Sequence, residues 1–322
     1  MNIILTALVG GVVFLVGGIV GAVWVHRRGA LPFVRRPEQW AISIYEGETP
    51  TDLTPLASVR HPVLTAADVT DVEADFVADP FLFQRDGRWY LFFEVVNART
   101  RAGEIGLATS ADGHEWTYER VVLAEPFHLS YPQVFAVDDT VYMLPESQQA
   151  AGIRLYEATS FPYEWTPVAT LLHGAYHDPT IVRYGGRWWL FCSEWHHTLR
   201  LFSSAALEGP WQEHPASPIV KNDERYARPA GRVVPYDGGL IRFAQDCSQF
   251  YGQHVHAFRI TELSADSYDE QLLQASVLTG SGTGWNALRM HHLDAHRMGE
   301  DRWLAAVDGD AGQKLRFSWR DL

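Results

Sequence analysis

The sequence predicts an all-β protein, a five-bladed β-propeller preceded by one N-terminal transmembrane helix. Three observations lead to this prediction: a β-hairpin pattern that recurs about every 50 residues, an incomplete last copy of that pattern, and a long apolar stretch at the start of the chain. Four strands in each unit of roughly 50 residues are typical of a propeller blade, whose sheet packs its faces against the neighbouring blades.

The first copy shows what is repeated. Two apolar runs, Phe81–Phe83 and Trp89–Phe93, flank an Asp-Gly turn, which is the signature of a β-hairpin. An Asp-Pro pair opens the first strand and a glutamate closes the second. Because these two ends of an antiparallel hairpin lie together, Asp79 and Glu94 are predicted to be neighbours.

Three further copies follow, and each pairs a residue before proline with a later acid. The residues before proline are 52, 47 and 50 positions apart, and the acids follow them by 15, 15, 16 and 18 positions. They are Asp79, Tyr131, Asp178 and Arg228, with the acids Glu94, Glu146, Glu194 and Asp246. Third strands are predicted over residues 104–109, 153–159, 199–204 and 254–260, and fourth strands near Trp116, Trp165 and Trp211.

The fifth copy is incomplete. Residues 291–296 are predicted as its inner strand, 303–307 as its second strand and 314–319 as its third strand. The apolar segment Trp40–Tyr45 is predicted to supply the missing outer strand by pairing with residues 314–319, because this closure would remove the last exposed sheet edges. Residues 38–322 then form one propeller domain.

The start of the chain predicts a membrane anchor. Residues Ile3–Val25 are 23 uncharged, mostly apolar positions, enough for a helix to cross a bilayer. A cleaved signal peptide is disfavoured, because no Lys or Arg precedes the run and no small-residue cleavage site ends it. Arginines at positions 27, 28, 35 and 36 follow, so the propeller is predicted to be cytoplasmic. Residues 1–28 are thus the anchor with its basic flank, and 29–37 a short linker.

Composition excludes several functions. The net charge is −13 and no basic stripe occurs, so nucleic-acid binding is not expected. The chain contains no glycine-rich phosphate loop and no dinucleotide fingerprint, so no nucleotide or redox cofactor is predicted. Its two cysteines, Cys192 and Cys247, are too few for a disulfide framework and are expected to be buried thiols, although one bond between them is conceivable.

Two polar rings are predicted at one mouth of the central channel. One ring opens the inner strands, with Asp79, Tyr131, Asp178, Arg228 and His292, and the other ends the second strands, with Glu94, Glu146, Glu194, Asp246 and Asp308. Any single acid could instead cap a turn. Five blades placing polar groups at one end favour a site, because glycosidic-bond chemistry needs one protonated and one ionised carboxyl.

Roles follow from this arrangement. Asp79 is predicted as the base, Glu194 as the acid and Asp178 as the orienting partner, with Glu94 and Glu146 as second choices. The residues predicted to bind substrate are Tyr131, Arg228, Asp246, Arg289, His291 and His292. On a strand His292, Asp294 and His296 would share a face, but without further ligands no metal site is predicted.

Several segments resemble a known family. Residues 76–81, 89–94, 103–108, 126–132, 142–147 and 290–292 are similar to the N-terminal domain of plant glucosamine inositolphosphorylceramide transferases and its bacterial relatives, over about Trp40 to Asp310. That domain resembles the five-bladed propellers of glycoside hydrolase family 43, whose members use an Asp base, an orienting Asp and a Glu acid. The resemblance implies that Asp79 is the base. Tyr131 and Asp178 depart from the expected Asp and Glu.

Three functions remain open. The anchor and the resemblance favour transfer of a sugar to a lipid-linked or membrane glycan acceptor. The carboxylate ring and the hydrolase-like fold favour a glycosidase. The departures from the hydrolase pattern favour a glycan-binding module without catalysis. A carbohydrate or glycolipid is the expected partner in each case.

Overall fold

The computed structural model describes residues 34–35, 38–313 and 316–317. The predicted membrane span at Ile3–Val25 lies outside this part. Among the residues that are described, no helix is both long and apolar enough to cross a bilayer. A two-stranded sheet formed by β1 (Val34–Arg35) and β24 (Arg316–Phe317) belongs to one compact unit, and residues Gln39–Gly312 form the other.

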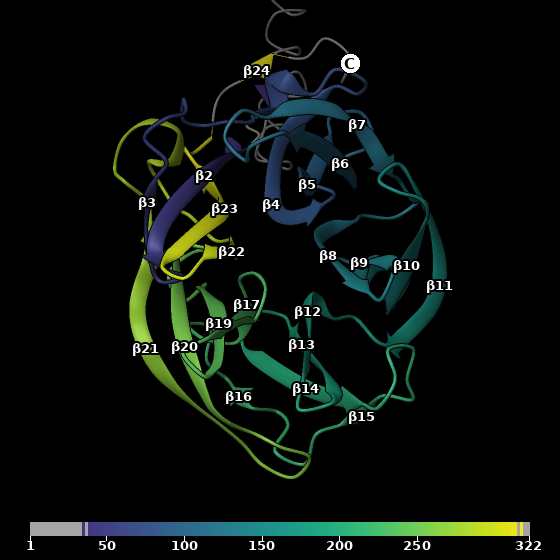
Figure 1. Cartoon of the computed structure of the whole chain (residues 1–322). Coiled ribbons are helices and arrows are strands. Elements are labelled where there is room, and N and C mark those ends of the chain that lie inside the picture. The colour runs from purple at the N-terminus through teal and green to yellow at the C-terminus, as the bar shows by residue number, and fades with distance from the viewer. Residues whose placement is uncertain (1–33, 36–37, 314–315, 318–322) are drawn as a thin grey trace, which may run out of the picture. The chain divides into compact units, whose positions relative to one another are not determined.

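The larger unit is a five-bladed β-propeller, as the repeat predicts (Figure 1). Five antiparallel sheets surround an axis, and we number the blades in the order of their inner strands. Blade one contains β4 (Ala74–Arg85), β5 (Arg88–Asn97), β6 (Gly103–Ser110) and β7 (Thr117–Leu123). Blade two contains β8 (Ser130–Val137), β9 (Thr140–Glu146), β10 (Gly152–Ser160) and β11 (Glu164–His173).

The third and fourth blades have interrupted strands. In blade three, β12 (His177–Tyr184), β13 (Arg187–Glu194) and β14 (Thr198–Ser204) are followed by two short pieces, β15 (Gln212–Glu213) and β16 (Val220–Lys221), which both pair with β14. In blade four, β17 (Arg228–Pro229) and β18 (Val234–Tyr236) both pair with β19 (Gly239–Asp246). The long strands β20 (His254–Leu263) and β21 (Tyr268–Thr279) complete it; β21 was not predicted.

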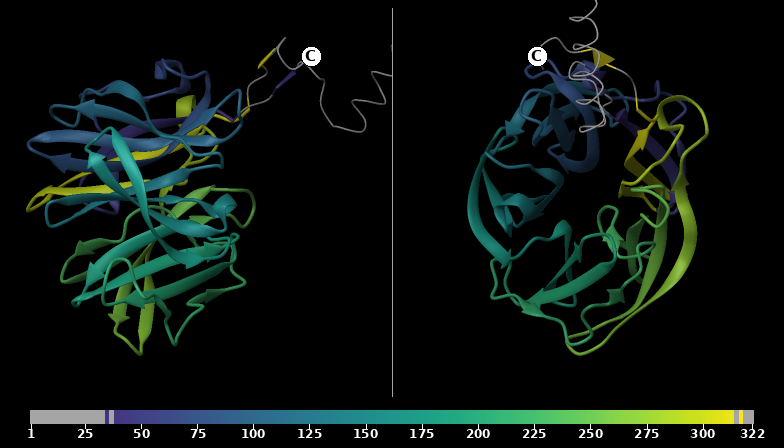
Figure 2. Two further views of the ribbon diagram at one scale, coloured as in Figure 1. Left: turned by 90° about the vertical axis from the view of Figure 1, so that its right-hand side faces the viewer. Right: turned by 180° about the vertical axis from the view of Figure 1, so that it is seen from behind.

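The fifth blade is closed by the N-terminal segment, but not in the predicted order. It contains β22 (Leu293–Gly299), β23 (Arg302–Asp310), β2 (Trp40–Thr49) and β3 (Asp52–Pro55). Trp40 pairs with Asp310 and Gly47 with Trp303, so the expected pairing of Trp40–Tyr45 with residues 314–319 is wrong. The six residues Trp40–Tyr45 of β2 are all buried, as a third strand requires, whereas the outer β3 is largely exposed. Figure 2 shows β2 and β23 side by side from behind.

The hydrophobic core consists of five clusters, one for each interface between neighbouring blades. Ile42 and Leu304 of blade five pack in one cluster with Leu82 of blade one, and Leu107 of blade one shares the next with Met143 of blade two. The other three clusters lie between blades two and three, three and four, and four and five. Cys192 and Cys247 are free, buried thiols, as predicted.

Polar contacts join the inner strands around the axis. Arg232, between β17 and β18, is paired with Asp294 of β22 at 2.9 Å and donates hydrogen bonds to the carbonyls of Leu82 and Val134. Asp294 also accepts the backbone N–H of Leu82 at 2.7 Å. Residues from blades one, two, four and five therefore meet at one ion pair.

A backbone irregularity redirects the residue before proline in three of the five inner strands. Asp79, Tyr131 and Asp178, each before a proline, have φ angles of 52°, 49° and 48°. Non-glycine residues seldom adopt this left-handed conformation. The strand pairing shifts by a bulge at the same points in β4, β8 and β12, which redirects these side chains out of the regular alternation.

Candidate functional site

Three buried residues form the first part of the candidate site. Asp308 Oδ1 lies 2.8 Å from His291 Nδ1, and Asp308 Oδ2 accepts the backbone N–H of Asp79 at 3.0 Å. The other ring nitrogen of the histidine, Nε2, lies 3.6 Å from Asp79 Oδ1. The imidazole also stacks on Trp40, with ring centroids 4.1 Å apart. It therefore connects two carboxyls and can exchange a proton between them.

Burial and neighbouring charges separate the pKa values of these two carboxyls. Burial raises the pKa of Asp79 well above its usual value; His291 opposes this shift, and the nearby Glu94 adds to it. Burial also acts on Asp308, but its ion pair with His291 lowers its pKa overall. Burial lowers the pKa of His291, yet Asp308 and Asp79 raise it overall. Asp79 is thus the carboxyl that takes up a proton most readily.

A second group surrounds Arg228. The guanidinium holds both carboxylate oxygens of Asp178, with Nη2 3.2 Å from Oδ1, and Gln245 Nε2 donates to Asp178 Oδ2 at 2.9 Å. Glu146 accepts the backbone N–H of Asp178 at 3.0 Å and lies 3.4 Å from His177 Nδ1. Two carboxylates are thus assembled around one cation.

Both of these carboxyls are ionised at neutral pH. Burial would raise the pKa of Glu146, but its contacts with His177 and Arg228 lower it to about 2. Burial raises the pKa of Asp178 to about 6, although Arg228 opposes the shift. Because Asp178 is held on both oxygens, it is poorly suited to donate a proton to a leaving group.

Glu94 has a separate partner. His128 Nε2 lies 3.0 Å from Glu94 Oε1, and the backbone N–H of Gly103 donates to His128 Nδ1 at 2.9 Å. Because Nδ1 accepts this bond, the ring proton is on Nε2 and points at the glutamate. Glu94 therefore keeps one oxygen engaged by a neutral histidine.

The structure does not bring Glu194 or Asp246 into these groups. Glu194 pairs with Arg200 at 2.8 Å, and two-fifths of its side chain is exposed. Asp246 accepts hydrogen bonds from Ser248 and His256. Side chains alternate between the faces of a strand, so the acids 16 and 18 positions after the residue before proline face away, whereas those 15 positions after it face the channel. Ser193 and Gln245 take the channel-facing places instead.

The remaining predicted residues line the groups or support them. Tyr131 is buried, accepts the backbone N–H of Gly231 at 2.6 Å and bonds Thr180, so its hydroxyl is fully engaged. Arg289 pairs with Asp310 at 2.9 Å. His292 is buried, neither of its ring nitrogens makes a hydrogen bond to another described residue, and burial lowers its pKa to about 4. Its Nδ1 lies 3.8 Å from Asp79 Oδ1.

One set of described side chains lies close enough together to hold a metal ion. Asp79, His291 and Asp308 each offer a ligand atom, all within 4.8 Å of one another. The strand face that carries Asp294 and His296 is different, because Asp294 is already occupied by Arg232, His296 and a backbone N–H.

Four residues of the site were not predicted from the sequence. His128 contacts Glu94, His177 contacts Glu146, and His196 Nδ1 accepts a hydrogen bond from Arg228 at 3.1 Å. Tyr251 lies over Arg228, with 5.0 Å between the guanidinium carbon and the ring centroid. His177 directly precedes a residue before proline and could have been found from the repeat. The others lie on turns that the repeat does not specify.

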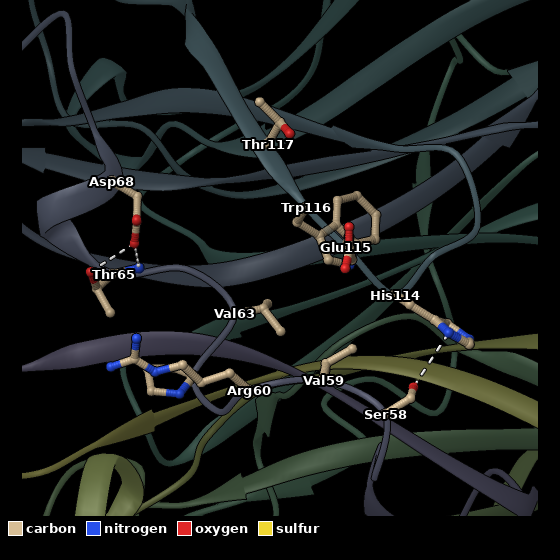
Figure 3. Close-up of a pocket in the computed structure, with 11 residues that line it drawn as sticks. Ser58, Val59, Arg60, Val63, Thr65, Asp68, His114, Glu115, Trp116 and Thr117 are labelled. Atoms are coloured by element: carbon tan, nitrogen blue, oxygen red, sulfur yellow. Dashed lines mark hydrogen bonds between the residues drawn. The ribbon is translucent and has the colours of Figure 1, made fainter.

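A separate pocket is lined by residues that follow β3 and by residues at the start of β7 (Figure 3). It has a volume of about 610 Å³ and is formed by the connection between β3 and β4 together with the turn between β6 and β7. Arg60 and Trp116 line it, and Ser58 Oγ is 3.4 Å from His114 Nδ1. None of the predicted site residues lines this pocket, so it is distinct from the polar groups at the channel.

Comparison with solved structures shows the same fold in glycoside hydrolases. A putative glycosidase from Bacteroides thetaiotaomicron superimposes with a TM-score of 0.60 at 12% identity, covering 82% of this chain and 98% of that one. The catalytic domain of the family 62 α-L-arabinofuranosidase from Coprinopsis cinerea gives 0.56 at 14%, covering 85% and 98%. At these identities the likeness shows the fold alone.

Sequence comparison is more specific. Glucosamine inositolphosphorylceramide transferase 1 of Oryza sativa subsp. japonica is 36% identical over 296 residues, and that of Arabidopsis thaliana is 34% identical over 299. The alignments cover 84% of this chain, which spans about 40% of the length of these relatives. The family described as glucosamine inositolphosphorylceramide transferase 1, N-terminal, matches residues 36–310. The resemblance that the motifs indicate is thus confirmed, and the chain belongs to this family.

Proposed function

We propose that the chain is a carbohydrate-active protein that transfers a sugar to a lipid-linked or membrane glycan acceptor at the channel mouth. The name of its relatives supports glycosyl transfer, and the shared fold with glycoside hydrolases supports a sugar at the axis of the propeller. In this proposal residues 3–25 anchor the chain with the propeller in the cytoplasm. A reporter fused after Leu322 that is active only outside the cytoplasm would contradict that orientation.

The difference in proton affinity between neighbouring carboxyls carries the proposal. Asp79 has a raised pKa and a histidine beside it, while Asp178 and Glu146 stay ionised around Arg228. Groups whose environments push their pKa values apart are suited to acid–base roles. In its ionised form Asp79 is the strongest base of these carboxyls, and it takes the proton of the acceptor hydroxyl. His291, held by Asp308, favours that ionised form. Arg228 and His196 orient the substrate.

A glycan-binding module without catalysis is the second candidate. It is favoured by Asp178, because the resemblance to family 43 places this residue where a general acid is expected. Arg228 and Gln245 hold it as an anion instead. If no other carboxyl supplies the acid, the site would recognise sugar and not cleave it.

One set of assays separates these functions. The purified full chain is tested in three assays. It is incubated with labelled sugar nucleotides and a lipid acceptor to detect transfer, with a panel of oligosaccharides to detect cleavage, and with the same panel to measure binding. Label appearing in the lipid only when both donor and acceptor are present supports transfer. Release of free sugar supports a glycosidase, and saturable binding without turnover supports the module. No turnover and no binding would overturn the proposed function.

A further inference from the structure

One aromatic side chain at the channel mouth is not explained by packing. Trp195 is 64% exposed, and it is the one tryptophan in the described part of the chain with more than a third of its surface accessible. Its indole N–H has no hydrogen-bond acceptor among the described residues. By contrast, the indoles of Trp116, Trp165 and Trp211 donate to carbonyls of their own turns. Trp195 therefore contributes little to the stability of blade three.

The backbone at this position is strained. Trp195 begins the short turn between β13 and β14, where Glu194 pairs with Thr198, and its φ angle is 53°. This left-handed conformation is uncommon for any residue except glycine and is an outlier for a bulky one. A large apolar side chain in a strained turn with most of its surface in water suggests that function determines the residue.

The turn lies next to the charged group of the candidate site. The ring of Trp195 is 5.8 Å from the ring of His177, which contacts Glu146. The next residue, His196, accepts a hydrogen bond from Arg228, the partner of Asp178. Trp195 is thus one side chain away from the Arg228 group and at the same end of the propeller.

A hollow continues from the turn toward blade four. His197 lies at its edge, and its carbonyl accepts the backbone N–H of Asp223 at 3.0 Å. The hollow has a volume of about 530 Å³ and is lined by His197, Asn222, Asp223, Glu224, Arg225 and Ser248. Asp223 and Arg225 form an ion pair at 2.7 Å, so carboxylate and guanidinium groups face the space together. Such groups can bond the hydroxyls of a sugar.

We propose that Trp195 is the stacking platform of a second sugar subsite, and that the hollow beside it receives the continuing end of an extended glycan. The faces of an indole carry partial negative charge, and the C–H groups on the apolar face of a pyranose carry partial positive charge, so the two surfaces attract. The polar edges of the same sugar remain free to bond the residues of the hollow. This subsite rests on the proposed function and specifies its substrate as an oligosaccharide longer than one unit.

The test uses the full chain and a glycan array printed with defined oligosaccharides, followed by calorimetric titration of the best-bound glycan and of its shorter forms. The parent should bind the longer forms more tightly than the monosaccharide. Trp195→Ala should lower the affinity for the longer forms about tenfold, the effect of losing one aromatic contact, and should remove the gain with length. Trp195→Tyr should retain part of it.

Two further variants keep the test decisive. Trp195→Gly suits a φ of 53°, so it should leave the melting temperature unchanged or higher while binding falls as in Trp195→Ala. Tyr184→Ala removes a 40% exposed ring from the opposite end of the same blade and should leave binding unchanged.

If the parent binds glycans and Trp195→Ala binds them equally, the subsite is wrong and the proposed function stands. If the parent binds none of the glycans, the subsite is wrong, and the proposed function is overturned only if turnover is absent as well. If the parent binds lipid vesicles that carry no sugar and Trp195→Ala loses this binding, Trp195 is a membrane contact and the subsite is wrong.

Discussion

At the scale of single residues, Asp79 combines a place at the channel with a raised pKa. It is held at the channel by a left-handed backbone conformation, lies next to His291, and has a pKa well above that of an ordinary aspartate. Asparagine has the same shape but cannot take up a proton. Asp79→Asn should therefore reduce turnover about 100-fold or more, the effect of losing a general acid or base. The measurement is the turnover number of whichever reaction the parent shows, sugar transfer or sugar release.

Asp79→Asn is expected to lower turnover without lowering stability. A carboxyl whose pKa is raised in the folded state destabilises the fold once the pH exceeds its unfolded pKa, because the unfolded chain then loses the proton first. Asp79→Asn removes this penalty, so its melting temperature at pH 8 should equal or exceed that of the parent. The difference should shrink toward pH 4.

Asp237→Asn is the matched control for Asp79→Asn, because this aspartate lies on the exposed turn before β19 and, within the described part of the chain, forms its ion pair with Arg259 alone. It should change neither turnover nor melting temperature. A loss of activity in Asp79→Asn together with a lower melting temperature would indicate a structural role and contradict the assignment.

At the scale of elements, closure of the ring depends on β2 more than on β3. Residues of β2 pair with β23 on one side and β3 on the other, and Ile42 and Ile44 are completely buried. Deleting residues 38–46 would expose β23 and remove part of two interblade clusters, so the variant should show no cooperative thermal unfolding. Circular dichroism against temperature measures this.

The control changes the outer strand of the same blade. Replacing residues 52–55 of the exposed β3 with a Gly-Ser segment should lower the melting temperature by a few degrees and keep a cooperative transition, since few apolar contacts are lost. If the β2 deletion unfolds at the temperature of the parent, the N-terminal strand does not close the ring.

The sequence predicts the elements well because the repeat is a local pattern. Hairpin strands and turns recur around four X-Pro pairs and once more in the incomplete last copy, and this number predicts the five blades. The position of β2 within blade five could not be predicted, because a repeat does not show whether a donated strand is third or fourth. In the structure, the burial of all six residues from Trp40 to Tyr45 distinguishes the third strand from an exposed fourth strand.

The site is predicted only in part for a related reason. Asp79, Glu94, Glu146, Asp178 and Arg228 were placed at the mouth by their positions in the repeat. Glu194 was assigned with them because the pattern was aligned by residue type. A shift from 15 to 16 positions reverses the face of a strand, so Ser193 takes the channel place. His177 precedes Asp178 in the repeat, but His196 and Tyr251 reach Arg228 through tertiary contacts that no spacing specifies.

At the scale of the whole molecule, one ion pair joins four of the five blades. Asp294 is completely buried and bonds Arg232, His296 and the backbone of Leu82, while Arg232 also bonds carbonyls of blades one and two. A second contact, between Gln133 of β8 and the backbone of Ile181 in β12, links blades two and three at 2.8 Å. The inner strands are therefore fixed by polar bonds as well as by apolar packing.

Arg232→Leu would leave the carboxylate of Asp294 buried without its cation. Breaking a buried pair in this way costs about 3–5 kcal/mol of unfolding free energy, because the remaining charge is uncompensated. The double variant Arg232→Leu with Asp294→Asn removes that charge and keeps an acceptor for Leu82, so its loss should be smaller than that of Arg232→Leu alone. Urea denaturation of the full chain measures both values.

The exposed pair of Arg259 and Asp237 provides the comparison for this axial pair. Its members lie 3.2 Å apart on the outer surface, where a salt bridge contributes about 0–1 kcal/mol. Arg259→Leu should therefore change the free energy of unfolding very little. If Arg232→Leu costs no more than Arg259→Leu, the blades are held by their apolar interfaces alone. A larger loss that the double variant partly restores would show that the uncompensated carboxylate of Asp294, and not lost apolar packing, causes most of the destabilisation.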